Sequence, residues 1–490
     1  MKIWSKRFPG LVVLGFASWL IAGCSCLPDK AYHPVCAGAS SCSDEDLKSA
    51  IRTPEKPTFI NSLGRDATHD KDASVRIHRA DPDEYRETHF QKAYLEYKED
   101  GSPADPPQRE AIRNFLRDRD RSRPLFVTVY VHGWHHNANT DTADEGSNAI
   151  KFDYLLARID DSLLRRRADY DILGIYVGWR GERTTTPIAT IFSVGDRAAV
   201  ADKIGSNKKP EGLRSTLQEF AELTRQTHPD SRLLVMGHSF GGRMLSRAFM
   251  QDLDRGHAQP LGSRTVINLI NPAIGADAYR RAYASENTSS DSQTPAWINL
   301  TSSDDRAAGI IFPLAGRVGL LHPDHADGTI QTIGNYYPYI THSIQVVDCS
   351  DPATPTLCAP VPALAAMAGN SIWAPGEDTR QTLLFQSTVG PRKTHNYCVQ
   401  MARHPTSPDV LDKIRQDMSC SNLVAAFTED NAPSLKARRV AGKGRMWNIV
   451  GDSALIEMKK TSLFSNHNAY VQTNWTVLMM DVVFASANAP

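Results

Sequence analysis

The stretch RLLVMGHSFGGRMLSRAF, residues 232–249, decides the fold that this chain is expected to adopt. Its first residues are apolar, as in a buried strand, and its last residues repeat apolar side chains at helical spacing. Between them lies GHSFG, residues 237–241, which puts a serine at the junction of strand and helix. Such a junction is either an ordinary glycine-rich turn or a strained turn that presents the serine hydroxyl for attack on a carbonyl carbon.

Strand and helix patterns alternate on both sides of this stretch. Residues 125–134, LFVTVYVHGW, are nearly continuously apolar, which is typical of a strand covered on both faces. Because helical segments separate the strands, the predicted fold class is α/β, with a mostly parallel sheet flanked by helices. The other predicted strands are 90–102, 171–179, 265–273, 296–303 and 445–456, and the predicted helices include 152–163, 213–220, 244–249 and 474–484.

Shifts in composition divide the chain into segments. We expect a signal peptide over residues 1–23 and a tether, rich in Asp, Ser, Pro and Ala, over 24–85. The α/β core is predicted in two parts, 86–306 and 441–490. Between these parts, before the last strand, lies a long insertion, 307–440, with weak periodicity and several cysteines. This insertion is either a lid over a site or a partner-binding module, and its residues favour neither.

The charge of the chain is balanced, with 55 Lys and Arg against 55 Asp and Glu. A balanced chain has no electrostatic reason to bind nucleic acid, so we expect no nucleic-acid partner. With 41% hydrophobic residues over a length of 490, the chain has material for a large core with additions.

The N-terminus has the pattern of an exported lipoprotein. Basic residues precede an apolar run over 11–22, which is short for a membrane span but suits a secretory signal. The run ends in IAGC, which resembles the lipobox of bacterial lipoproteins and predicts lipidation of Cys24. Ser25, which follows, favours the outer membrane. The alternative is a plain secretory signal; either way we expect the cell envelope.

Export permits disulfide bonds. If Cys24 is lipidated, the remaining number of cysteines is odd, so one thiol has no partner within the chain. No cysteine spacing resembles a zinc site. The plausible local pairs are Cys36 with Cys42, Cys349 with Cys358, and Cys398 with Cys420, which leaves Cys26 over.

Ser239 is the predicted nucleophile. A serine hydroxyl needs a histidine to take its proton and a carboxylate to orient that histidine. In an α/β-hydrolase topology the chain order is serine, acid, histidine. Asp305 follows a strand at the position for the acid, with Asp304 and Asp277 as alternatives, and His467 follows the last strand at the position for the base.

A second glycine-bearing loop is expected to supply donors for an oxyanion. His132-Gly133-Trp134 follows the strand residues LFVTVYV, 125–131, and we expect the backbone N–H groups of Trp134 and Phe240 to form the pair of donors. The imidazoles of this loop also admit a metal site, because histidine is a common zinc ligand. They lie in one short loop without a carboxylate at a suitable spacing, so we expect packing and hydrogen bonding instead, and neither a metal nor a cofactor.

With these residues in place, the chain resembles serine esterases and lipases of the α/β-hydrolase superfamily. It is particularly similar to a group of bacterial α/β-hydrolase-like lipoproteins. The resemblance covers about 86–306 and 440–490, and it implies Ser239 as nucleophile, Asp305 as acid and His467 as base. It also implies Trp134 and Phe240 as oxyanion donors. The segments that carry it are YVHGWHHNA, GWRG, MGHSFGGR, TSSDDRAA and SNHNAY.

The expected function is a membrane-anchored serine hydrolase that cleaves carboxylic esters through an acyl-enzyme. Its substrate is a small-molecule or lipid ester, because Trp134 and Phe240 give the predicted site an apolar rim. A thioesterase, amidase or acyltransferase uses the same residues. The alternative from a different class is a lipid-anchored surface protein that uses a hydrolase scaffold for binding.

Overall fold

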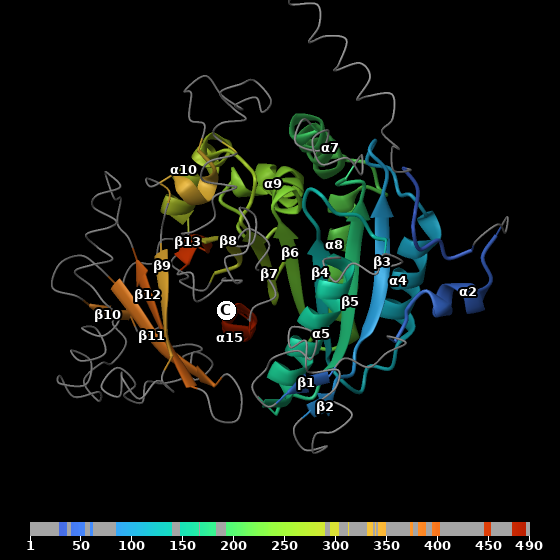
Figure 1. Ribbon diagram of the computed structural model, residues 1–490, viewed down its shortest axis with the longest axis horizontal. Coiled ribbons are helices and arrows are strands. Elements are labelled where there is room, and N and C mark those ends of the chain that lie inside the picture. Colours follow the sequence, from blue (N-terminus) through green and yellow to red (C-terminus); the bar gives the residue numbers. More distant parts are fainter. Residues whose placement is uncertain are drawn as a thin grey trace, which may run out of the picture.

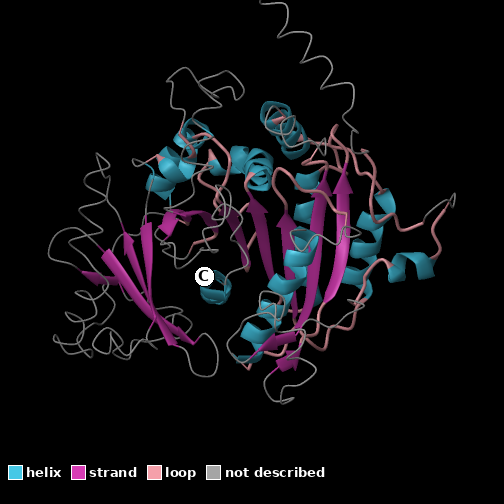
Figure 2. Ribbon diagram, viewed as in Figure 1, coloured by secondary structure: helices cyan, strands magenta, loops and turns pink. Residues whose placement is uncertain are grey.

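One large sheet runs through the molecule and carries helices on both faces (Figure 2). The computed structural model is an α/β fold, as the sequence predicts. It describes residues 29–36, 41–53, 59–61, 85–139, 148–165, 167–182, 193–289, 295–302, 312, 331–336, 339, 342–348, 373–375, 381–388, 394–401, 445–451 and 473–486.

The strands of the core are all parallel to their neighbours, in the order β13-β8-β7-β6-β4-β5-β3. β4 and β6, at the centre, are buried along their whole length, which agrees with their continuous apolar sequences. The bounds of these strands are β3 (Gln91–Tyr97), β4 (Leu125–Val131), β5 (Asp171–Trp179), β6 (Arg232–His238), β7 (Thr265–Ile270), β8 (Trp297–Ser302) and β13 (Met446–Gly451).

Successive side chains along the strands point to opposite faces of the sheet, and they belong to two hydrophobic clusters, one on each face. Val129 of β4 belongs to the cluster under α4, α7, α8 and α9, whereas Tyr130 belongs to the cluster under α5 and α15. The molecule therefore has three layers, with the sheet between two layers of helices. The helices are α2 (Asp44–Ser49), α4 (Pro106–Asp118), α5 (Asn148–Arg165), α7 (Val194–Ser206), α8 (Leu213–Thr227), α9 (Phe240–Leu253), α10 (Arg280–Ser289) and α15 (Thr473–Ser486), with 3₁₀ turns η1 (Ala276–Tyr279) and η3 (Ile333–Asn335).

The carboxyl ends of the parallel strands meet at one edge of the sheet, which we call the carboxyl edge. In Figure 1 the arrowheads of β3 and β6 point toward α7 and α9. In open α/β sheets, ligands bind at this edge. The loops that leave β4, β6, β7, β8 and β13 all begin there, and they carry the residues predicted for the site.

Part of the predicted insertion extends the sheet. β9 pairs in parallel with β13, and β12 pairs antiparallel with β9, followed by β11 and β10. These strands continue the core sheet beyond β13 (Figure 1). Their bounds are β9 (His342–Asp348), β10 (Trp373–Pro375), β11 (Gln381–Thr388) and β12 (Thr394–Met401).

The predicted tether is packed against the domain over its described residues. Backbone N–H groups of Tyr32 and His33 donate to the carboxylate of Glu96 in β3, at 2.8 and 2.9 Å. The His33 ring stacks on Tyr94 with a centroid distance of 3.6 Å. In the turn after β3, the Glu99 N–H donates to the Asp29 carboxylate at 3.2 Å. This segment therefore covers the free edge of β3, which would otherwise expose unpaired backbone groups.

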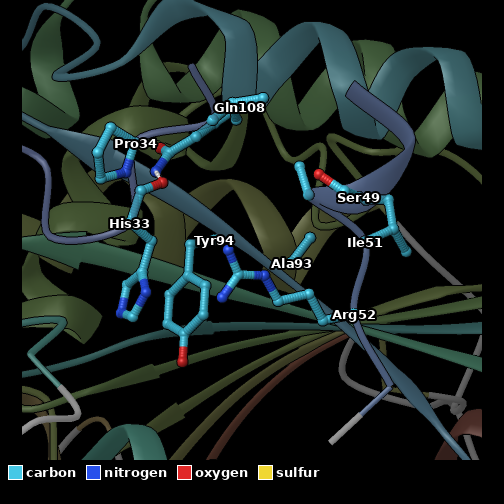
Figure 3. Close-up of a pocket in the computed structure, with 10 residues that line it drawn as sticks. His33, Pro34, Ser49, Ile51, Arg52, Ala93, Tyr94 and Gln108 are labelled. Atoms are coloured by element: carbon cyan, nitrogen blue, oxygen red, sulfur yellow. Dashed lines mark hydrogen bonds between the residues drawn. The ribbon is translucent and has the colours of Figure 1, made fainter. Parts of the chain in front are cut away.

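A small hollow remains between this N-terminal segment and the sheet. Figure 3 shows His33 and Tyr94 on one side of it and Arg52 on the other. The Arg52 backbone pairs with Lys92 of β3 through N–H···O bonds of 2.8 and 2.7 Å, so the segment adds a short antiparallel bridge to the sheet. Two further strands near the N-terminus, β1 (Phe59–Asn61) and β2 (Tyr85–Glu87), form an antiparallel pair of their own.

One predicted disulfide is present, and the other two predicted pairs involve cysteines whose side chains the structure does not describe. Cys36 and Cys42 are bonded, with their Cα atoms 5.5 Å apart. Cys24 and Cys26 lie outside the described residues, as do Cys349, Cys358 and Cys420, and no side-chain contact of Cys398 is described. No helix in the described part of the chain combines the length and apolar character required to cross a membrane.

Candidate active site

Ser239 stands at the sharpest backbone turn of the carboxyl edge. It links β6 to α9 with φ 53° and ψ −116°. A residue with a Cβ adopts such a positive φ only at a cost of about 1–3 kcal/mol, and such strain is concentrated at functional sites. A strained serine between a strand and a helix is the conformation that a nucleophile elbow requires.

Glycines let the backbone pass this serine at close range. A Cβ on Gly241 would overlap the carbonyl oxygen of Val131, at the end of β4. A Cβ on Gly133, in the loop after β4, would lie 2.8 Å from the Cβ of Ser239. The loop after β4 and the serine turn are therefore in direct contact, and larger residues at 133 and 241 would separate them.

The backbone of Ser239 is fixed while its hydroxyl is not. Its N–H donates to the Ile270 carbonyl at 3.0 Å, and its own carbonyl accepts from the N–H groups of Arg243 and Ala273, both at 3.1 Å. Its side chain caps no helix and makes no hydrogen bond to another residue in the described ranges. Ser239 as a residue is 6% exposed, and none of the other described residues forms a hydrogen bond with its hydroxyl.

Both predicted oxyanion donors lie beside Ser239. Phe240 is the first residue of α9, so its N–H has no acceptor within the helix and lies at the positive end of the helix dipole. Trp134 is half-buried and its ring centroid is 6.5 Å from that of Phe240. The indole Nε1 of Trp134 donates to the Ser193 hydroxyl at 3.3 Å. The structure therefore brings Phe240 and the loop that carries Trp134 next to Ser239, and the role of their N–H groups as oxyanion donors stays a prediction.

His132, directly before this loop, has both ring nitrogens occupied. Nδ1 donates to the Gly133 carbonyl at 2.8 Å, and Nε2 accepts from the Trp179 N–H at 3.1 Å. The ring is stacked between Tyr176 and Trp179, each with a centroid distance of 5.6 Å. Burial lowers the pKa of His132 to about 4. This imidazole is therefore a neutral packing residue that has no nitrogen left for a metal or a proton transfer.

The other two histidines of the loop, His135 and His136, differ in their surroundings. His135 has φ 66° and places Nδ1 3.9 Å from a carboxylate oxygen of Glu182. Burial, with a smaller contribution from His132, holds the pKa of His136 well below its usual range. In the described part of the chain, no three His, Cys, Asp or Glu residues are arranged to hold a metal ion.

The low pKa of His132 makes the protein less stable in mild acid. The unfolded chain binds a proton at this histidine below pH 6.5, whereas the folded chain does so only below about pH 4. The contribution of His132 to the free energy of unfolding is therefore complete above about pH 6.5 and is lost as the pH falls toward 4. Urea unfolding at pH 4.5 should show a loss of roughly 2–3 kcal/mol from this residue relative to pH 7.

The matched variant is His132→Asn, whose amide keeps a donor near the position of Nδ1. Its free energy of unfolding should fall less between pH 7 and 4.5 than that of the wild type. Some pH dependence should remain, because the pKa of His136 is also held low by burial. Equal slopes for the variant and the wild type would show that His132 is protonated in the folded protein at pH 4.5.

The predicted acid and base lie outside the described residues. Asp304 and Asp305 follow β8, and His467 lies between β13 and α15. The alternative acid, Asp277 in η1, is described and has an unusual environment. It is 7% exposed, and neither of its carboxylate oxygens has a hydrogen-bond partner among the described residues. A buried carboxylate without partners requires an explanation, because desolvation of its charge is costly.

The structure adds residues that the sequence interpretation did not identify. Asn271, after β7, has φ 46° and accepts the Ser302 N–H at 3.0 Å, so it ties β7 to the end of β8. An Asn-Pro pair after a strand favours a turn, but a residue before proline usually has an extended backbone, so the sequence indicated neither the positive φ of Asn271 nor its contact. Arg243 of α9 makes a double hydrogen bond to Asp202 of α7, at 2.7 and 2.6 Å. No short-range pattern predicts that pair.

The comparisons with known proteins identify no relative of this chain. No model of a known protein family matches the sequence. A search of curated proteins likewise returns no match. The functional conclusions therefore depend on the geometry of the site and the sequence around it.

Proposed function

We propose that the protein is a serine hydrolase of the α/β-hydrolase type that cleaves carboxylic esters in the cell envelope. The observation that carries the proposal is the backbone of Ser239, with its positive φ between β6 and α9. The burial of Ser239, whose hydroxyl makes no hydrogen bond to another described residue, and the adjacent N–H groups of Phe240 and Trp134 support it. A glycine-rich turn with a purely structural role would have no need for a strained serine.

In this reaction Ser239 Oγ forms a bond to the ester carbonyl carbon. The hydroxyl proton passes to a histidine, for which we propose His467, and the carbonyl π electrons move onto oxygen. The N–H groups of Phe240 and Trp134 stabilise that oxyanion. When the tetrahedral intermediate collapses, the bond to the alcohol oxygen breaks and the histidine returns its proton to the leaving alcohol. Water then releases the acid from Ser239 by the same steps.

The apolar surroundings of the donors favour an ester with an acyl or aryl group. Trp134 packs against the hydrophobic cluster that includes Phe240, so apolar surface borders the proposed hole. Residues 1–23 and Cys24 support export and lipidation, which would bring the domain to a membrane, most simply the outer membrane.

The test is activity of the purified wild-type chain toward p-nitrophenyl butyrate, together with labelling by a fluorophosphonate probe that reacts with activated serines. We expect both hydrolysis and stoichiometric labelling. A chain that is folded by circular dichroism but neither labels nor hydrolyses the ester would overturn the proposal and favour the binding-protein alternative.

Replacing the proposed acid should lower turnover strongly. Asp305→Asn removes the charge that orients His467, and it should reduce kcat by about 10⁴-fold. Asp277→Asn is the matched variant, since it removes the one described candidate carboxylate, which is buried without partners. We expect it to retain most of the turnover, measured with the same ester. The reverse result would assign the acid to Asp277.

A further inference from the structure

We propose that α7 sets the distance between the two oxyanion donors, with Ser193 and Asp202 as positioning residues. The inference rests on the proposed hydrolase function. It concerns how the loop after β4, which carries Trp134, is held at a fixed distance from α9, which begins with Phe240. These two donors come from separate segments of the chain, so no local hydrogen bond fixes the distance between them.

The first contact is at the beginning of α7. Ser193, the residue before the helix, is 8% exposed and accepts a hydrogen bond from Trp134 Nε1 at 3.3 Å. The Trp134 indole has only this one polar atom, so the bond fixes the ring and, through it, the direction of the backbone at 134. A second bond, from the His135 N–H to the Gly181 carbonyl at 3.2 Å, holds the next residue of the loop.

The second contact is in the middle of α7. Asp202 accepts two hydrogen bonds from Arg243, at 2.7 and 2.6 Å, and one from Arg247 Nε at 2.9 Å. The Arg243 side chain is 7% exposed and that of Asp202 is 29% exposed, so the buried guanidinium makes a fork-shaped pair with a half-buried carboxylate. Arg243 lies in the first turn of α9, and its N–H donates to the Ser239 carbonyl at 3.1 Å. Asp202 therefore holds the turn of helix that follows Phe240.

The two helices also approach closely. A Cβ on Gly205 would overlap the Met244 carbonyl oxygen and lie 2.9 Å from the Cβ of Arg247. Arg197 ties the other side of α7 to the loop after β5 through a hydrogen bond to the Arg180 carbonyl at 2.8 Å. α7 is thus anchored on both sides, and it contacts both donor segments at once.

The chemistry explains why such an anchor would matter. An oxyanion is stabilised only when both N–H groups are within about 2.7–3.1 Å of it, and each donor contributes roughly a hundredfold or more to the rate. The negative charge exists in the transition state and not in the ground-state ester. Loosening the distance between donors should therefore lower kcat and leave KM nearly unchanged.

The experiment compares Asp202→Asn with Asp252→Asn in the full chain. Asp252 is on α9 and, like Asp202 of α7, it pairs with an arginine of a neighbouring helix, in this case Arg214 of α8, at 3.1 Å. It lies at the far end of α9 from Phe240, so it controls for loss of an ion pair between helices. Readouts are kcat and KM for p-nitrophenyl butyrate, and Ki for an alkyl trifluoromethyl ketone. Ser239 adds to the carbon of this ketone, and the resulting oxyanion takes the place of the one in the reaction.

For Asp202→Asn we expect kcat to fall by about 10- to 100-fold, KM to change by less than about threefold, and Ki to rise in proportion to the loss of kcat/KM. Asp252→Asn should lower the melting temperature about as much as Asp202→Asn does, because each variant removes one ion pair between helices. Unlike Asp202→Asn, it should leave kcat and Ki near the wild-type values. Ser193→Ala, which removes only one neutral hydrogen bond, should lower kcat in the same direction by a smaller factor. It remains informative if Asp202→Asn does not fold.

Two outcomes overturn the inference, and they are distinguishable. If the wild type hydrolyses the ester but Asp202→Asn and Ser193→Ala retain its kcat and Ki, then α7 has no positioning role and the hydrolase proposal stands. If the folded wild type neither hydrolyses the ester nor binds the ketone, the proposed function fails and this inference fails with it.

Discussion

Ser239→Ala should reduce kcat for p-nitrophenyl butyrate by about 10⁵- to 10⁶-fold and abolish fluorophosphonate labelling. The variant removes the only atom that forms a bond to the acyl carbon. Fold and stability should be retained, because Ser239 is held by backbone hydrogen bonds, to Ile270, Arg243 and Ala273, and not by its side chain. Mass spectrometry of the labelled wild type should place the adduct on Ser239.

The matched control is Ser246→Ala, on the same helix. The Ser246 hydroxyl is also buried, but it donates to the Gly242 carbonyl at 2.9 Å and lies 2.7 Å from the Tyr279 hydroxyl, away from the elbow. This variant should label and turn over as the wild type does. Labelling that persists in Ser239→Ala would assign the reactive serine elsewhere and remove the basis of the proposed function.

His467→Ala should have an effect on kcat of nearly the same size, because serine and histidine act as one unit. Two of the described histidines near Ser239 are poor bases. His132 uses both ring nitrogens and has a pKa of about 4, and the pKa of His136 is held well below its usual range by burial. β13 ends at Gly451, at the carboxyl edge, so the segment that carries His467 leaves the sheet at the edge where Ser239 lies.

The comparison variant is His395→Ala, in β12 of the strands beyond β13. It should leave kcat unchanged, while His467→Ala loses both turnover and fluorophosphonate labelling. The rate in His467→Ala should recover in part when imidazole is added, since a free base can then accept the Ser239 proton. If His395→Ala were inactive and His467→Ala active, the base would be His395.

Much of the α/β core could be predicted, because its signals are local. The apolar runs of β4, β6 and α15 and the helical spacing in α5 depend only on nearby residues, and each element lies where its pattern indicated. The serine turn was also predictable, because the glycines at 237 and 241 are required by close approach of the backbone. That approach is encoded within five consecutive residues, 237–241.

Features that depend on distant partners were not predictable. α7 has a mixed apolar pattern, and its role becomes visible only through its contacts with Trp134 and Arg243. The strands within 342–401 lack strong periodicity, and their place in the sheet depends on the pairing of β9 with the edge of β13. The packing of Tyr32 and His33 depends on one buried carboxylate, Glu96, whose pKa is raised by desolvation. Each of these contacts joins residues far apart in the sequence.

If Cys24 carries a lipid, the docking of Asp29 on Glu99 would limit how far the domain can stand from a bilayer. Residues 25–28 separate Asp29 from Cys24, and even fully extended they reach about 18 Å. Glu99 follows the carboxyl end of β3, so the anchoring point lies at the same sheet edge as Ser239. With a lipid on Cys24, that edge would be confined to the interfacial layer, where it would meet lipid head groups rather than molecules diffusing in bulk solvent.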